Sequence, residues 1–145
     1  MQGLPHDYTV HVSASADSTV NLHIENISDL ELSAPANFGG PGTLHSPEDL
    51  QTAAVASCFI LSFKAIARAS KLEWESLEVK VCGTLDMVDR AMQFTGFSTH
   101  ASLTLPADGS REKATRLLEK AEQSCLITNS LKAENHLEIS LEGGE

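Results

Sequence analysis

The segment HSPEDLQTAAVASC, residues 45–58, begins a long helix and then places a thiol in its apolar body. Ser46 is a good helix N-cap, Pro47 suits the first helical position, and the acidic Glu48 is favoured at the positive end of the helix dipole. The helix is predicted to run to about Ser70, and its middle is apolar or small on almost every side. Because such a helix has to be covered all round, we expect one face to pack on a sheet and the other on a second subunit.

Alternation of apolar and polar residues with a period of two predicts strands before and after this helix. A second helical pattern and a last strand follow, so the order is strands, long buried helix, strands, helix, strand. This order is typical of an α+β fold with antiparallel sheets and helices on one side, here as a single domain over residues 1–145. The predicted strands lie within 8–34 (about three strands) and at 77–85, 97–105 and 136–141, and the second helix covers 110–126.

The charge and the N-terminus exclude several classes of function. The net charge is −10, from 20 acidic and 10 basic residues, and Lys and Arg do not cluster. A nucleic-acid partner needs a basic face, and an anionic membrane surface is disfavoured for the same reason. The N-terminus has no basic region followed by an apolar run, and the longest uncharged run, residues 50–63, is too short to span a bilayer. We therefore expect a cytoplasmic protein without nucleic-acid or membrane partners.

The chain has three cysteines, Cys58, Cys82 and Cys125. An odd number in a cytosolic chain argues against a structural disulfide framework. There is no Cys-x-x-Cys pair and no close Cys/His spacing, so a metal site is not expected. Cys82 falls on the charged face of its strand, whereas Cys58 and Cys125 fall on buried helical stripes. These two are either core residues or redox thiols.

A reactive Cys58 would have to be a thiolate, because the thiol itself reacts poorly. The pKa of a free cysteine lies near about 8.5, and burial raises it. Cys58 therefore needs a positive charge or hydrogen-bond donors close by, and its mid-helix position rules out help from its own helix terminus. Glu48 lies ten residues earlier, about 15 Å along one helix, so the two cannot touch within that helix. If Glu48 acts on a cysteine, we expect the target to be Cys58 of the partner subunit, across antiparallel helices at a dimer interface.

Two segments resemble the OsmC/Ohr family of osmotically induced and organic-hydroperoxide-resistance proteins. These are GGPGTLHSPEDLQTAAVASCFILSF, residues 39–63, and LLEKAEQSCLITNSL, residues 117–131. The order of the predicted elements is also similar, so the resemblance spans nearly the whole chain. It implies an OsmC-like α+β fold with antiparallel sheets around a long buried helix, in an intertwined homodimer with two active sites at the interface.

The resemblance also implies an activity, the thiol-dependent reduction of organic hydroperoxides. Cys58 matches the peroxidatic cysteine, which the hydroperoxide oxidises to a sulfenic acid, and Cys125 matches the resolving cysteine, which closes a Cys58–Cys125 disulfide. Glu48 matches the family's carboxylate, and Cys82 matches no family residue. The family uses no bound cofactor; an external thiol, in some members a lipoyl dithiol, restores the pair.

The chain departs from the family in one respect. Hydroperoxide reductases of this family carry an arginine in the N-terminal strand region, where it stabilises the thiolate, but here no Lys or Arg precedes Lys64. Histidine is the substitute that the N-terminal region offers, at His45 or His23 rather than at His6 or His11, and Arg68 of the partner subunit is another. Weak activity or a different substrate would follow if none of them acts.

Two other readings remain open on the sequence alone. The first is a non-catalytic binding protein of the same dimeric fold, with an apolar pocket at the interface and inert thiols. The second is a purely structural dimer. Mass spectrometry after peroxide challenge separates them from the enzyme, because only the enzyme forms the Cys58–Cys125 disulfide.

Overall fold

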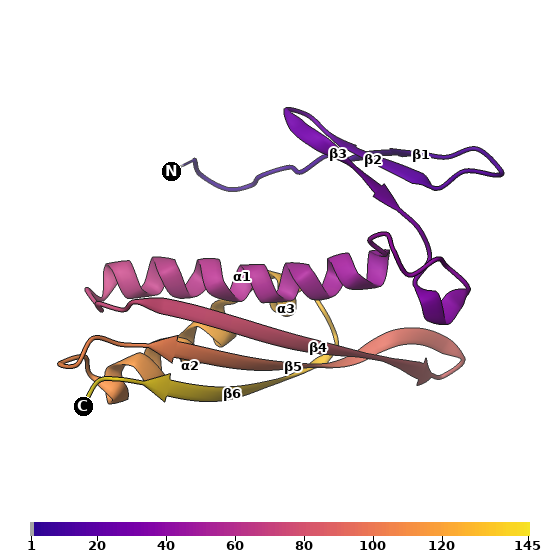
Figure 1. The fold of residues 1–145 in the computed structure, drawn as a ribbon. Helices are drawn as coiled ribbons and strands as arrows, with labels where there is room; N and C mark the ends of the chain where they lie inside the picture. The colour runs from indigo at the N-terminus through magenta and orange to yellow at the C-terminus, as the bar shows by residue number, and fades with distance from the viewer. Residues whose placement is uncertain (1) are drawn as a thin grey trace. The chain divides into compact units, whose positions relative to one another are not determined.

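The computed structural model describes residues 2–145, which form two compact units, one up to Leu50 and the other from Gln51 to Glu145. Each unit is built on its own three-stranded sheet (Figure 1). That the two units act as one domain over residues 1–145 stays a prediction.

The N-terminal unit contains the predicted antiparallel meander. Its strands β1 (His11–Ser13), β2 (Val20–Ile24) and β3 (Ile27–Leu32) lie in the order β1-β2-β3 and pair antiparallel. A short 3₁₀ helix, η1 (Ala36–Phe38), follows. Apolar residues of the first predicted strand, among them Val10 and Val12, are more than half exposed in the single chain.

The long helix α1 (Pro47–Ala69) begins where the sequence predicts. The Ser46 hydroxyl accepts the Asp49 N–H at 3.1 Å and donates to the Asp49 carboxylate at 2.9 Å, so the cap forms as expected. By length and composition α1 could cross a bilayer, a test that the core helix of a soluble protein also passes. Part of α1 is indeed core, because four residues spaced at i, i+4 are buried: Val55, Phe59, Phe63 and Ala67.

Another side of α1 is exposed in the single chain, where the sequence predicts a second subunit as its cover. Leu61 is 65% exposed, and Ala53 and Ala65 are also exposed. One sheet of a small domain reaches only one side of a helix, so any cover for the remaining apolar residues has to come from another source.

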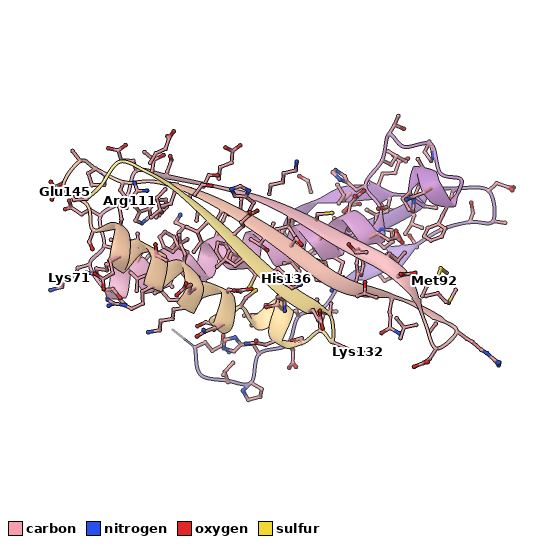
Figure 2. All side chains as sticks on the ribbon, turned by 90° about the horizontal axis from the view of Figure 1, so that it is seen from below. Lys71, Met92, Arg111, Lys132, His136 and Glu145 are labelled. Atoms are coloured by element: carbon pink, nitrogen blue, oxygen red, sulfur yellow. The ribbon has the colours of Figure 1, made fainter. Side chains whose placement is uncertain are left out.

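The sheet of the C-terminal unit is longer than predicted. Strands β4 (Ser76–Val88) and β5 (Ala91–Thr104) form one antiparallel hairpin. Its tip is a two-residue turn at Asp89 and Arg90, both with positive φ. This turn is not predicted from the sequence, because Asp-Arg lacks the glycine that is typical of such hairpins. Figure 2 shows Met92, next to the tip, at the opposite end of the unit from Arg111.

The expectation of purely antiparallel sheets is wrong for this unit. Strand β6 (Glu134–Glu142) pairs parallel with β5, which gives a mixed sheet in the order β4-β5-β6. The chain between the two strands passes through α2 (Arg111–Ser124) and α3 (Leu126–Asn129). Such a helical crossover returns the chain to the end of the sheet where β5 began, so β6 has to run in the same direction.

Helices α1 and α2 contribute to one core against the sheet. The same buried cluster contains Phe59 and Phe63 of α1, Leu118 of α2, and Ala101 and Leu103 of β5. The alternate residues of the strands are exposed and polar, as the period of two predicts; they include Lys80, His100 and Glu138. The sheet therefore has one apolar face under the helices and one face in water.

The second predicted helix is interrupted. It was expected over residues 110–126, but α2 ends at Ser124 and α3 begins at Leu126. Cys125 lies between them with φ −64° and ψ 110°, an extended conformation, and it caps both helices. The buried Cys125 is thus in a break of the helix rather than within its stripe.

Candidate active site

Two cysteines from distant parts of the C-terminal unit meet at the break between α2 and α3. Cys58 lies on α1 directly before the buried Phe59 and is itself partly buried. Cys125 is 2% exposed. The Cys125 side chain is a hydrogen-bond partner of the Cys58 sulfur, although 67 positions separate the two residues in the chain. Both are free thiols.

Backbone N–H groups also point at the Cys58 sulfur. The first N–H groups of a helix have no carbonyl partner within that helix. Because the chain restarts as α3 directly after Cys125, the N–H groups of Leu126 and Ile127 are in this position. Both donate a hydrogen bond to the Cys58 sulfur.

These contacts decide the direction in which the pKa of Cys58 shifts. Burial by itself raises the pKa, since it penalises the charged form. The Ile127 N–H, the Cys125 and Ser62 side chains and the Leu126 N–H act in the opposite direction, and together they hold the pKa of Cys58 below its usual value. Hydrogen bonds to the thiolate, and not a neighbouring charge, cause this shift.

Ser62 is the side-chain hydroxyl of the site. It lies one turn after Cys58 on α1, and its Oγ is 4.0 Å from the Cys58 Sγ. Sequence reasoning missed Ser62, although its spacing of four residues from Cys58 on a predicted helix was a signal. It also missed the two N–H donors, which only the tertiary structure brings to the sulfur.

Three further residues named from the sequence are Cys82, Arg68 and Glu48. Cys82, which matches no family residue, is exposed on β4. Arg68 is exposed on α1 ten positions after Cys58, about 15 Å along the helix, so within its own chain its backbone is far from the thiol. Glu48 is in the first turn of α1 and belongs to the N-terminal unit. The action of Glu48 on Cys58 of the partner subunit stays a prediction.

The proposed histidine substitutes also lie in the N-terminal unit. His23 has a carboxylate partner there, with 2.7 Å between its Nδ1 and the Asp29 Oδ1. This hydrogen bond from His23, followed by one from Asn21, lowers the pKa of Asp29. His45 is exposed and forms an isolated parallel bridge with Leu32. Within residues 2–145, no group of three His, Cys, Asp or Glu side chains is arranged to hold a metal ion.

A model of the family of OsmC-like proteins matches residues 40–140, which include both cysteines of the cluster. The chain belongs to the OsmC-like family. The resemblance carried by the two cysteine segments is thereby confirmed.

Relatives of this OsmC-like chain include one that is named for organic hydroperoxide resistance. The protein YmaD of Bacillus subtilis, described as uncharacterised, is 30% identical over 120 residues, covering 79% of this chain and 80% of its own. An organic hydroperoxide resistance protein of Xanthomonas axonopodis pv. citri is 28% identical over 136 residues, covering 92% of this chain and 94% of its own.

The α+β fold with a long helix is also that of solved OsmC-like structures. An OsmC-like protein of unknown function from Vibrio cholerae superposes with a TM-score of 0.83 at 18% identity, over 93% of this chain and 99% of that one. At this identity the match concerns the fold alone. It agrees with a chain in which a long helix packs on a mixed sheet.

Proposed function

We propose that this OsmC-like protein is a thiol peroxidase that reduces organic hydroperoxides at Cys58. The observation that carries the proposal is the cluster in which Cys58, with its lowered pKa, faces the buried Cys125. A thiolate is the form that attacks a peroxide, and a second thiol at hydrogen-bond range is what a sulfenic acid needs in order to close a disulfide. The relative named for organic hydroperoxide resistance supports the choice of substrate.

The reaction has three steps. The Cys58 thiolate attacks one oxygen of the hydroperoxide, the O–O bond breaks, and the alkoxide leaves as the alcohol after taking up a proton. Cys58 is then a sulfenic acid, and the Cys125 thiol displaces its hydroxyl as water to form the Cys58–Cys125 disulfide. An external thiol or dithiol reduces this disulfide by thiol–disulfide exchange and is itself oxidised.

We propose that the active form is a homodimer. Support comes from the apolar side of α1 that stays open in the single chain, with Leu61 65% exposed, and from the exposed Val10 and Val12. In such a dimer Glu48 would act as the carboxylate of the site that contains Cys58 of the partner subunit, since its own Cys58 is out of reach along α1.

Cys58 and Cys125 have different roles in this mechanism. Peroxide turnover and the intact mass of single-cysteine variants distinguish them. Cys58→Ser is expected to abolish reduction of cumene hydroperoxide, because it removes the thiol to which the N–H groups of Leu126 and Ile127 donate. Cys125→Ser is expected to permit one oxidation per site, seen as a mass increase of one oxygen atom on Cys58, and then to stop. The exposed Cys82 provides the matched control: Cys82→Ser should turn over like the wild type.

Two results would contradict this mechanism. Unimpaired turnover by both Cys58→Ser and Cys125→Ser would remove the two-thiol reaction. Absence of any Cys58 oxidation in the wild type would instead favour a non-catalytic binding protein with inert thiols.

A further inference from the structure

Ser62 is placed to interact with the reactive sulfur by the geometry of α1. Residues four apart on a helix lie on the same face, one turn from each other. Ser62 and Cys58 are such a pair, both are partly buried, and the Ser62 Oγ is 4.0 Å from the Cys58 Sγ. The hydroxyl is therefore a direct neighbour of the atom at which the proposed reaction begins.

The contact differs from what helical hydroxyls do elsewhere in this chain. A Ser or Thr on a helix commonly donates to the carbonyl four residues earlier. Four other hydroxyls donate to the backbone carbonyl four residues earlier: Ser57 to Ala53 (2.7 Å), Thr115 to Arg111 (2.9 Å), Ser124 to Lys120 (2.7 Å) and Ser130 to Leu126 (2.8 Å). Among the contacts within residues 2–145, the Ser62 hydroxyl instead meets the side chain of the residue four positions earlier.

We propose that Ser62 is a hydrogen-bond donor of the redox site, whose hydroxyl stabilises the Cys58 thiolate. When Cys58 is ionised the sulfur can only accept, so the hydroxyl has to donate, and a hydrogen bond to a charged acceptor is stronger than one to a neutral thiol. The contact therefore favours the thiolate. This inference rests on the proposed thiol chemistry, but it concerns the ionisation of Cys58, which can be measured without peroxide.

The experiment is the pH dependence of Cys58 alkylation by iodoacetamide, followed by peptide mass spectrometry so that each cysteine is read separately. In Ser62→Ala the midpoint of the profile should move to higher pH, and the rate at pH 7 should fall roughly two- to tenfold, as for loss of one ordinary hydrogen bond. The rate at high pH should not fall, because a less stabilised thiolate is at least as nucleophilic.

Ser57→Ala is the matched control, since Ser57 lies on the same helix and donates to a carbonyl. Its profile should coincide with that of the wild type. Ser62→Thr and Ser62→Val form a second pair of similar shape, in which only threonine keeps the hydroxyl. Threonine should restore most of the wild-type profile and valine should not, a comparison that separates the hydroxyl from any change in packing.

A Ser62→Ala profile that overlies the wild type, or equal profiles for Ser62→Thr and Ser62→Val, would overturn the inference. The peroxidase proposal can be refuted separately. If peroxide turnover is absent but the alkylation midpoint still depends on the Ser62 hydroxyl, the protein is not a peroxidase and the role of Ser62 is supported. If turnover is present and the alkylation midpoint of Ser62→Ala equals that of the wild type, the peroxidase proposal is supported and the role of Ser62 is refuted.

Discussion

At the scale of single residues, the groups that lower the pKa of Cys58 are neutral hydrogen-bond donors. Cys58 receives hydrogen bonds from the N–H groups of Leu126 and Ile127 and from the side chains of Cys125 and Ser62, and they outweigh the effect of burial on its pKa. A family arginine would add a positive charge, whose field reaches further than a hydrogen bond does. Short-range donors instead act only on a sulfur that is held in one position.

The nature of the donors predicts the pH dependence of Cys58 oxidation. Backbone N–H groups do not titrate near neutrality, so the rate of oxidation by an organic hydroperoxide should rise with pH as the thiolate forms and then reach a plateau. Because hydrogen bonds lower the pKa of Cys58, the half-maximal rate should lie at a lower pH than for an unperturbed cysteine. Stopped-flow rates between about pH 5 and 9 measure this.

His45→Ala and Arg68→Ala are the informative comparisons for that profile. Both should keep the plateau and its midpoint if the hydrogen bonds suffice. A bell-shaped wild-type profile that His45→Ala abolishes would show that a histidinium supplies the charge. If Arg68→Ala raises the midpoint of the profile, Arg68 of the partner subunit supplies the positive charge.

At the scale of elements, the decisive feature is the break between α2 and α3. One continuous helix over residues 110–126 would have used the N–H groups of Leu126 and Ile127 in its own hydrogen bonds. The extended conformation of Cys125, with ψ 110°, ends α2 and frees both groups. Because of the interruption, the N–H groups of Leu126 and Ile127 can donate hydrogen bonds to the Cys58 sulfur on α1.

Leu126→Pro tests this element directly, because proline has no N–H. Proline is favoured at the first position of a helix, and the extended Cys125 before it is compatible with a following proline. Leu126 is 66% exposed, so little burial is lost. We expect the same fold by circular dichroism, with the alkylation midpoint of Cys58 moved to higher pH.

Leu126→Ala is the control for that substitution, since it shortens the same side chain but keeps the N–H. Its midpoint should match the wild type. Equal midpoints for the proline and alanine variants would mean that the Leu126 amide does not stabilise the thiolate.

At the scale of the whole molecule, part of the apolar surface of α1 is exposed in the single chain. The stripe of Val55, Phe59, Phe63 and Ala67 is buried within the chain, while Leu61 is exposed on another side of the same helix. Exposed apolar surface of this kind is a candidate interface. This feature underlies the proposal of a homodimer.

Leu61→Glu should weaken that dimer, because it would bury an unpaired carboxylate at the interface. Sedimentation equilibrium at low micromolar concentration should give a dimer for the wild type and at least a tenfold higher dissociation constant for the variant. Lys80→Glu, on the polar face of the sheet, is a control that also introduces a carboxylate and should stay dimeric. A wild-type protein that sediments as a stable folded monomer would remove the basis for a shared site.

The sequence by itself determined the elements whose causes are local. The cap at Ser46, the extent of α1, the meander and the alternation in β4–β6 follow from propensities and periods that act over a few residues. The two cysteine segments indicated the family that the match to residues 40–140 then confirmed. Cys58 and Cys125 could be named as candidates on the same basis, because their segments are recognisable residue by residue.

Only the tertiary structure decided how these elements meet. The parallel direction of β6 depends on a crossover through two helices, and the extended Cys125 overrides a helical pattern that continues on both sides of it. Apart from Ser62, the hydrogen-bond partners of Cys58 come from a segment 67 and more positions away, so no local pattern could assign them. Hydrogen bonds of this kind depend on the position of one element against another, which packing of the core fixes and local propensity does not.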